Sequence, residues 1–475
     1  MCKFHQTRRQ FLRTASMASM AGFYVSPFLL ELNSVAAMAQ ESSGSDYRAL
    51  VCVYLQGGND GHGTVIATDT DSYNAFVQAR SGAPGLAYSM SDLLPITLQT
   101  PQSGRSFALN PYLTGVQNLF SAGRAAIVAN TGTLVEPATK TQINANSVVL
   151  PDSLYSHFDQ TAAWQAISSN LGSGQHSGWG GAVADAIESM NMNSNSIFTC
   201  ISTSGNTLFL AGNSSVQLNV TPAGPIPISG LTQPPFGGSV NPLNSILTAD
   251  ETNLFAQEYQ SIVELSMKAQ ATLATAMAPA GEGGVANAPP YLDPVSKKLM
   301  DNPLADALQT VARIIAGRSQ LGVTRQIFYV ELGSFDTHNN QAQVHSQLLT
   351  QLGAAFEYFD GLMVGMGLSN NVTAFTISDF GRTLTCNSNG TDHGWGSHHF
   401  VLGGAVNGQN MYGQFPVVGV DQANDVGEGR LIPTTAVEQY AGTLASWFGL
   451  SNSQIQQVFP NFNNFGSSPL LGFMS

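Results

Sequence analysis

Charged side chains are scarce in this sequence. They make up 10% of its 475 residues, and only 17 are Lys or Arg against 30 Asp or Glu. The formal net charge at pH 7 is −13. Nucleic-acid phosphates and anionic membrane surfaces repel an acidic protein. The composition therefore argues against nucleic acid and against an anionic membrane surface as partners.

Cysteine is also scarce, with 4 residues in the whole chain. No two are spaced as Cys-x-x-Cys, which excludes a zinc knuckle of that kind. Cys52, Cys200 and Cys386 follow the N-terminal segment described next, and three cysteines allow at most one disulfide. Their pairing stays open, but a scaffold built on disulfides is excluded.

The N-terminal segment has the layout of an export signal. Arg8 and Arg9 precede a Phe-Leu pair, an apolar stretch follows at 15–30, and the small-x-small sequence Ala-Met-Ala stands at 37–39. We interpret residues 1–39 as a twin-arginine signal peptide, with the twin-arginine translocase as partner during export. The apolar stretch is too short and too interrupted to span a membrane, so we expect a periplasmic or secreted protein without a stable membrane anchor. A basic soluble helix is the alternative interpretation.

Apolar runs rich in β-branched residues recur along the chain, and most end at Gly, Asn, Ser or Asp. They span 48–55, 125–129, 326–332, 372–377 and 400–403. Helical spacing of apolar residues occupies 251–277, 304–315, 344–362 and 436–448. Strands that alternate with helices predict an α/β protein with a mostly parallel central sheet and helices on both faces.

The strand runs are spread over the whole chain, which favours one large domain. We expect this domain to cover residues 40–475. Two stretches rich in Gly and Pro, near 205–243 and 278–294, have the composition of insertions into it.

Acidic and histidine side chains flank several predicted strands. They are Asp60 after the first strand, Asp336 and His338 after the third, Asp379 after the fourth, and Asp392 and His393 before the fifth. Open parallel sheets bind ligands beyond the carboxyl ends of their strands. Carboxylates with imidazoles are the donors that zinc, manganese or iron take. The alternative is that these residues only form turns, for which Asp and Asn are common.

The motifs that contain these residues resemble known metal-dependent proteins. Residues 330–336 (VELGSFD) are similar to the Val-Glu-x-Gly-x-x-Asp segment of alkaline phosphatases, and 390–394 (GTDHG) to a metal-binding segment of phosphopentomutases. Together with 56–61 (QGGNDG), 335–338 (FDTH) and 380–383 (FGRT), they resemble the family called domain of unknown function 1501. Its members are often exported by the twin-arginine route and are grouped with the alkaline phosphatase and sulfatase superfamily.

The resemblance implies an alkaline phosphatase-like fold and two metal positions. Asp336 and His393 would hold the first ion, with His338 as a further ligand, and this mixed oxygen and nitrogen set favours zinc. Asp60 and Asp379 would hold the second. Phe380 stands where relatives have a histidine, so the second site offers only oxygen and favours magnesium or calcium.

Three residues are candidates for catalysis. Residues 156–164 loosely resemble the alkaline phosphatase nucleophile segment, and its register places His157 at the nucleophile position with Ser156 beside it. Arg382, three residues after Asp379, could clamp two oxygens of a phosphate or sulfate. The structural alternatives are a helix cap for Ser156 and an ion pair with an acidic residue for Arg382.

These features support two hypotheses from different classes. The first is an exported metal-dependent hydrolase of phosphate or sulfate esters, with a small molecule or a polymer as substrate. No Cys-x-Pro-x-Arg sequence is present, which excludes the formylglycine chemistry of sulfatases. The second is a non-catalytic metal-binding or envelope-assembly protein outside the cytoplasm.

Overall fold

The computed structural model describes residues 46–102, 104–166, 177–226 and 253–475. The predicted signal peptide at 1–39 and part of the predicted insertion at 205–243 lie outside the described residues. Residues Asp46–Ser475 form one compact unit. None of the helices within the described ranges is both long enough and apolar enough to cross a bilayer.

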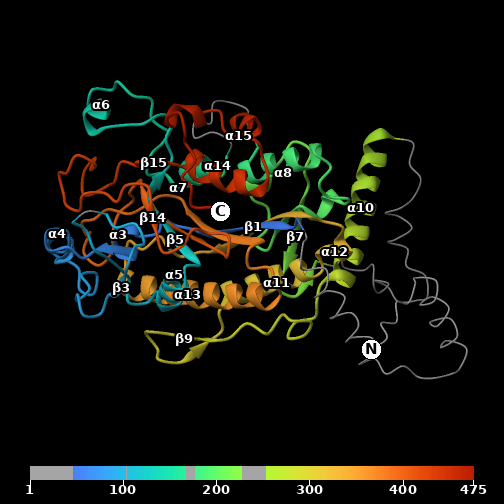
Figure 1. Ribbon diagram of the computed structural model, residues 1–475, viewed down its shortest axis with the longest axis horizontal. Helices are drawn as coiled ribbons and strands as arrows, with labels where there is room; N and C mark the ends of the chain where they lie inside the picture. The colour runs from blue at the N-terminus through green and yellow to red at the C-terminus, as the bar shows by residue number, and fades with distance from the viewer. Residues whose placement is uncertain (1–45, 103, 167–176, 227–252) are drawn as a thin grey trace, which may run out of the picture. The chain divides into compact units, whose positions relative to one another are not determined.

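A single large sheet forms the centre of this unit (Figure 1). Its strand order is β14-β5-β13-β12-β1-β11-β6-β7-β8, and β15 also pairs with β5. The strands are β1 (Arg48–Leu55), β5 (Ala125–Gly132), β6 (Cys200–Ser202), β7 (Gln217–Thr221), β8 (Gly224–Pro225), β11 (Arg325–Leu332), β12 (Val372–Ser378), β13 (Ser397–Leu402), β14 (Met411–Tyr412) and β15 (Thr435–Ala436).

Most strand pairs in this sheet are parallel. β12, β1, β11, β6 and β7 run in the same direction. β13 is antiparallel to both of its neighbours, β12 and β5, and β8 is antiparallel to β7. The predicted mostly parallel sheet is therefore confirmed, and β13 is its main exception.

Helices cover both faces of the sheet. In Figure 1, α5 (Thr114–Ser121), α11 (Pro303–Ala316) and α13 (Gln341–Gly365) lie on one side of it. On the other side lie α7 (His157–Gln165), α8 (Trp179–Ser189), α14 (Val437–Phe448) and α15 (Asn452–Val458). The predicted fold class, α/β with helices on both faces, is confirmed.

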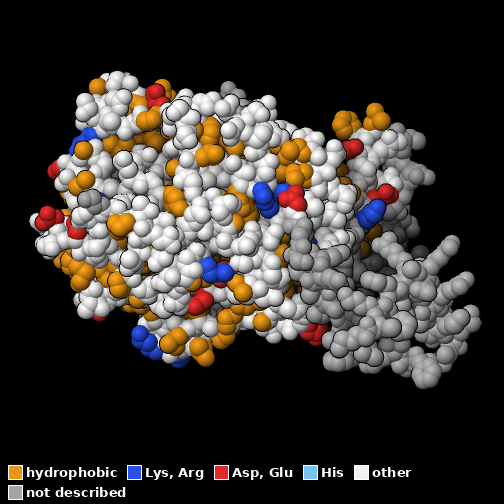
Figure 2. Space-filling view, viewed as in Figure 1, with side chains coloured by type: hydrophobic (Ala, Val, Ile, Leu, Met, Phe, Trp, Pro, Cys, Tyr) orange, Lys and Arg blue, Asp and Glu red, His pale blue; other side chains and the backbone are white. Residues whose placement is uncertain are grey.

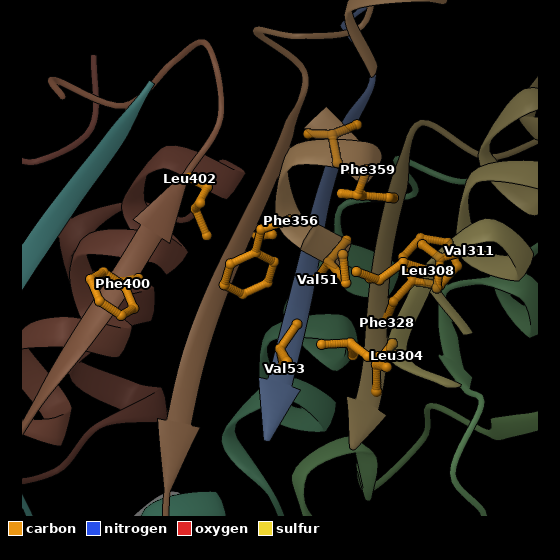
Figure 3. Packing of buried hydrophobic residues seen from close by; sticks show 14 of the residues in the cluster. Val51, Val53, Leu304, Leu308, Val311, Phe328, Phe356, Phe359, Phe400 and Leu402 are labelled. Atoms are coloured by element: carbon orange, nitrogen blue, oxygen red, sulfur yellow. The ribbon is translucent and has the colours of Figure 1, made fainter. Parts of the chain in front are cut away.

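The residues of β1 alternate between the two cores that these helices cover. Val51 and Val53 pack in the core that contains Leu304 and Leu308 of α11 and Phe356 of α13 (Figure 3). The intervening Leu50, Cys52 and Tyr54 lie in the second core, with residues of α8 and α14. Burial on both faces explains why the strand is apolar throughout rather than alternating.

The remaining elements lie outside the main sheet. They are α3 (Gly61–Thr64), α4 (Thr70–Arg80), α6 (Lys140–Asn144), α10 (Leu254–Ala276), α12 (Arg318–Leu321), the short helices η1 (Ser196–Phe198), η2 (Leu208–Leu210) and η3 (Phe462–Phe465), the sheet β2 (Val65–Ala67), β4 (Phe107–Leu109) and β3 (Leu94–Ile96), and the pair β9 (Tyr291–Leu292) and β10 (Leu299–Met300). The described part of 205–243 contains η2, β7 and β8, and it adds two strands to the main sheet.

The described surface and the cysteines agree with the composition. Figure 2 shows few Lys, Arg, Asp or Glu side chains among a large majority of uncharged atoms on the visible face. Cys52, Cys200 and Cys386 are free, and the first two are buried in the sheet. Among the described residues, therefore, no disulfide holds the fold together.

Candidate metal centre

The carboxyl ends of three adjacent parallel strands bring the predicted loops together. β11, β1 and β12 lie side by side, and the loops that follow them carry Asp336 with His338, Asp60, and Asp379, respectively. α7 lies on one face of the sheet and begins with His157. The loop before β13 supplies His393.

Two imidazoles and one carboxylate form a group of metal donors. His157, Asp336 and His393 each offer one ligand atom, and these atoms lie within 4.8 Å of one another. Asp336 Oδ1 is 3.4 Å from the Nε2 atom of His157 and 3.4 Å from that of His393. The two Nε2 atoms are 3.1 Å apart. Such spacings are those of neighbouring ligands on one transition-metal ion with bonds of about 2.0–2.2 Å.

His338 reaches the same point. Its Nε2 is 2.8 Å from His393 Nε2 and 3.1 Å from Asp336 Oδ1. It therefore lies close to two of the three donor atoms, those of His393 and Asp336. We call His157, His338, His393 and Asp336 the metal cluster.

The other ring nitrogen of each histidine fixes the tautomer. Nδ1 of His157 is 2.6 Å from Asp379 Oδ2, Nδ1 of His338 is 3.0 Å from Asp392 Oδ1, and Nδ1 of His393 is 2.7 Å from the Tyr155 carbonyl oxygen. All three partners are acceptors, so each Nδ1 carries the hydrogen. In the neutral rings, three Nε2 lone pairs then converge on a carboxylate oxygen. These pairs repel one another unless a cation lies between them, and the donor set therefore fits a metal.

The charges around the cluster are only partly balanced. Burial alone would raise the pKa of Asp336, but the Arg382 guanidinium and the nearby imidazoles hold it below its usual value. The hydrogen bond that His157 donates to Asp379 raises the pKa of His157, whereas burial lowers the pKa of His393. Arg382 contacts Asp336 Oδ1, the oxygen on which the imidazoles also converge.

Asp60, predicted as a ligand, is engaged elsewhere. Its oxygens accept from Arg80 at 2.7 and 2.8 Å, and Gln341 Nε2 donates to it at 2.7 Å. Burial would raise the pKa of Asp60, but Arg80 overrides this and lowers it strongly. Nearby, His345 Nε2 is 3.0 Å from the Asn59 side-chain oxygen. We call Asp60, Arg80, Gln341, Asn59 and His345 the Asp60 network.

Asp379 bonds to one histidine of the metal cluster. One oxygen accepts from the Tyr54 hydroxyl at 2.7 Å and from the Gly57 amide at 2.9 Å, and the other bonds to His157. Both carboxylates of the predicted oxygen-only site thus have protein partners. Within the described ranges, the one group of donors that could hold an ion is His157, Asp336 and His393, and His338 lies beside it.

Two of the three predicted catalytic residues, Ser156 and Arg382, bond to groups within the protein. Ser156 is the N-cap of α7, and its hydroxyl donates to the Asp159 carboxylate at 2.6 Å. The Arg382 side chain is completely buried and donates to the carbonyl oxygens of Gly58, Thr391 and Gly57 as well as to Asp336. All of these partners lie within the protein, and a catalytic role of Arg382 stays a prediction.

Phe380 forms one wall of the cluster. Its ring centroid lies 4.7 Å from that of His157 and 4.8 Å from that of His393. The ring also lies against Gly58, where an added Cβ would come within 2.5 Å of it. Gly58 has a φ of +85°, so the turn after β1 requires glycine for its conformation as well as for space.

The cluster opens onto a cavity of about 870 Å³. His157, Asp336 and Asp379 line it, and strand residues Tyr54 and Tyr329 form its floor. The other lining residues are Gln56, Gly57, Phe158, Thr161, Ala162, Gln165, Ser204, Asn206, Thr207, Leu208, Glu331 and Ser334. The Tyr54 hydroxyl lies 2.7 Å from Thr161 Oγ1, which connects α7 to the floor.

Sequence reasoning placed His157 at this site but in another role. The register with the nucleophile segment suggested a catalytic role, and the structure brings its ring together with Asp336 and His393 in a group that could hold an ion. Tyr54 was not identified because it reads as one more residue of an apolar strand. The one signal that could have identified Tyr54 is a hydroxyl group near the carboxyl end of an otherwise apolar strand.

Comparisons with known proteins give one family and several distant structures. The model of the family described as "Protein of unknown function (DUF1501)" matches residues 47–459. No curated protein matches the chain. The fold is similar to Ps i-CgsB in complex with k-i-k-neocarrahexaose, which is 9% identical over 89% of this chain and 77% of that chain, with a TM-score of 0.35. It is also similar to the PsFucS1 sulfatase from Pseudoalteromonas sp., 7% identical over 90% of this chain and 73% of that chain, with a TM-score of 0.31. At these TM-scores neither likeness says anything about activity.

Proposed function

This chain belongs to the DUF1501 family, because residues 47–459 match the model of that family. For this member we propose the function of a metal-dependent hydrolase of phosphate or sulfate esters. The observation that carries the proposal is the metal cluster. Three Nε2 lone pairs and one carboxylate oxygen converge beside a cavity that could hold an ester.

His157, His338, His393 and Asp336 would hold the ion. Three imidazoles and one carboxylate are a set that zinc takes in preference to magnesium or calcium. When bound, a zinc ion acts as a Lewis acid that polarises the ester oxygen. A second ion at Asp60 and Asp379 stays a prediction, which the molar ratio of metal to protein would test, and the partners of both carboxylates favour a single ion.

The chain's own groups orient the donors and shape the site. Asp379 and Asp392 hold His157 and His338 in the tautomer that presents Nε2 to the ion. α7 carries two hydroxyls near the cluster. Ser156 caps the helix, whereas Thr161 lines the cavity and bonds to Tyr54. We therefore place Thr161, and not Ser156, next to the bound ester.

The test combines metal content with hydrolysis. Wild-type protein, purified and dialysed against a weak chelator, should retain zinc and hydrolyse 4-nitrophenyl phosphate or 4-nitrophenyl sulfate. The His393→Ala variant should lose both. His399→Gln is the matched control, because His399 is a buried histidine outside the cluster. A wild-type protein that retains no metal, or a His393→Ala variant that retains all of it, contradicts the proposal.

A non-catalytic metal-binding protein is the second candidate. One observation favours it: neither Lys nor Arg is among the described residues that line the cavity, so only the ion could neutralise an anionic ester. Tight zinc binding without hydrolysis of either ester would support this candidate.

We also propose that the protein works outside the cytoplasm after export by the twin-arginine translocase. The motivation is the order of Arg8, Arg9, the apolar stretch at 15–30 and the cleavage sequence at 37–39. Replacing both arginines with lysine should leave the precursor in the cytoplasm, as cell fractionation would detect. Export of the unchanged precursor in a strain without that translocase contradicts this proposal.

A further inference from the structure

We infer that the cavity beside the metal cluster is a subsite for a neutral carbohydrate, which would be the alcohol part of the ester. Its position next to the ion rests on the proposed function. Its chemistry rests on the size of the cavity, on the charges and hydrogen-bonding groups that line it, and on one exposed aromatic ring.

The cavity is much larger than a phosphate or sulfate group needs. Its volume of about 870 Å³ lies in the range of sites that enclose a whole organic ligand, roughly 300–1,000 Å³. The metal cluster occupies one part of the wall, through His157 and Asp336. The rest of the volume is available to the group that the ester carries.

The charges of the lining argue against an anionic group in this space. The charged residues that line it are Glu331, Asp336 and Asp379, and no described Lys or Arg joins them. Burial, followed by the charge of Asp379, raises the pKa of Glu331. Carboxylates repel a further phosphate, sulfate or uronate but accept hydrogen bonds from hydroxyl groups.

Several lining side chains have hydrogen-bonding capacity to spare. Gln56, Ser334 and Glu331 line the cavity, and among the described residues no hydrogen bond joins their side chains to another group. Gln56 follows β1, Ser334 follows β11, and Glu331 lies near the end of β11, so all three are at the carboxyl edge of the sheet. Asn206 and Thr207, beyond the end of β6, line another part of the cavity. A mixture of amide, hydroxyl and carboxylate groups matches the alternating donors and acceptors of a polyol.

An aromatic ring completes the subsite. Phe158 follows the metal donor His157 directly, lines the cavity and is 84% exposed. A single exposed Phe is ordinary on a protein surface, but this one lies beside a polar cavity and an apolar neighbour, Ala162. The apolar C–H face of a sugar ring can cover a phenyl ring while its hydroxyls reach the polar wall.

The experiment measures binding of neutral oligosaccharides to the full mature protein. The probes are cello-, chito- and agaro-oligosaccharides, with tri-alanine as a peptide control. Titration calorimetry and saturation-transfer NMR would measure the binding of each probe. At least one carbohydrate series should bind. Phe158→Ala should weaken that binding about tenfold, and Glu331→Gln should also weaken it. Phe255→Ala is the matched control, because Phe255 is 88% exposed but does not line the cavity.

The outcomes separate this inference from the proposed function. The His393→Ala variant should keep carbohydrate binding while it loses metal and hydrolysis. Hydrolysis of simple esters without binding of any oligosaccharide would overturn the subsite and leave the hydrolase standing. Binding that Phe158→Ala and Glu331→Gln do not change, or binding of tri-alanine in place of the sugars, would also overturn it.

Discussion

The metal cluster and the Asp60 network both lie beyond the sheet's carboxyl ends, yet their carboxylates are satisfied in different ways. Asp60 and Arg80 are almost completely buried and form two hydrogen bonds to each other. Asp336 is 47% exposed at its side chain and is surrounded by the Nε2 atoms of three histidines. The first network is complete within the protein, whereas the second contains a group that could hold an ion.

This difference teaches how to judge an acidic residue after a strand. Position alone selects both Asp60 and Asp336. The full set of partners decides, because Arg80 engages both oxygens of Asp60, whereas Arg382 contacts only Oδ1 of Asp336 and imidazole Nε2 atoms lie beside that same oxygen.

The largest expected effect is on stability and comes from breaking the Asp60 network. Arg80→Met leaves the Asp60 carboxylate buried without its partner, which should lower the free energy of unfolding by about 3–5 kcal/mol. Zinc content should not change. Chemical denaturation and elemental analysis would measure both quantities.

The matched control for Arg80 is Arg124→Met, which removes a partly exposed pair with Asp360. That variant should cost about 1 kcal/mol or less. If Arg80→Met also removed the metal, Asp60 would belong to the metal cluster after all.

The next effect is on metal affinity. In Asp379→Asn, the Tyr54 hydroxyl and the Gly57 amide would hold the amide oxygen and turn the amide nitrogen towards His157. The imidazole would then lose its Nδ1 acceptor, and zinc affinity should fall about 10- to 100-fold. Competition with a chelator would measure it. Asp69→Asn, at the N-cap of α4, should have no effect. An unchanged affinity in Asp379→Asn would refute the supporting role of Asp379.

A third prediction concerns how pH changes the stability of the Asp60 network, through His345. Burial lowers the pKa of His345 to about 4, below the unfolded value of about 6.5. The unfolded chain therefore binds a proton that the folded chain excludes, and stability is lost as pH falls from about 6.5 towards 4.

Between pH 7 and 5, wild-type protein should lose about 2 kcal/mol more stability than His345→Gln. Denaturation at the two pH values, with metal removed from both proteins, would measure the difference. Equal losses in the two proteins would show that His345 is not held neutral.

The smallest expected effect concerns Ser156. As the N-cap of α7, it should contribute about 1 kcal/mol, so Ser156→Ala should lower stability by that amount. Zinc content and hydrolysis should persist because the hydroxyl bonds to Asp159 rather than facing the cavity. A folded Ser156→Ala variant without hydrolysis would return Ser156 to the catalytic role that its sequence position suggests.

Much of the fold is predictable because burial determines it locally. The run at 48–55 predicts β1 with its observed bounds, since both faces of that strand are covered. The run at 436–448 predicts α14 to within one residue. The direction of β13 was not predictable, because antiparallel and parallel pairing leave the same apolar run in the sequence.

For the site, the sequence could predict only which residues lie next to the ends of strands. Asp336, His338 and His393 follow from their positions beside strands. His157 comes from the start of a helix, and Arg80 comes from the last residue of α4, so their contacts depend on how distant segments pack. No periodicity in the sequence encodes which of the two aspartates bonds to an arginine through both oxygens and which lies among imidazoles.

The floor and the rim of the cavity should differ in how freely they can evolve. The floor residues Tyr54 and Tyr329 also belong to the core between the sheet and α8, so any replacement there disturbs folding and chemistry together. The rim residues Phe158 and Ser334 are exposed and support no core. Related proteins could therefore acquire new substrate preferences through the rim while the floor and the donors beneath it are retained.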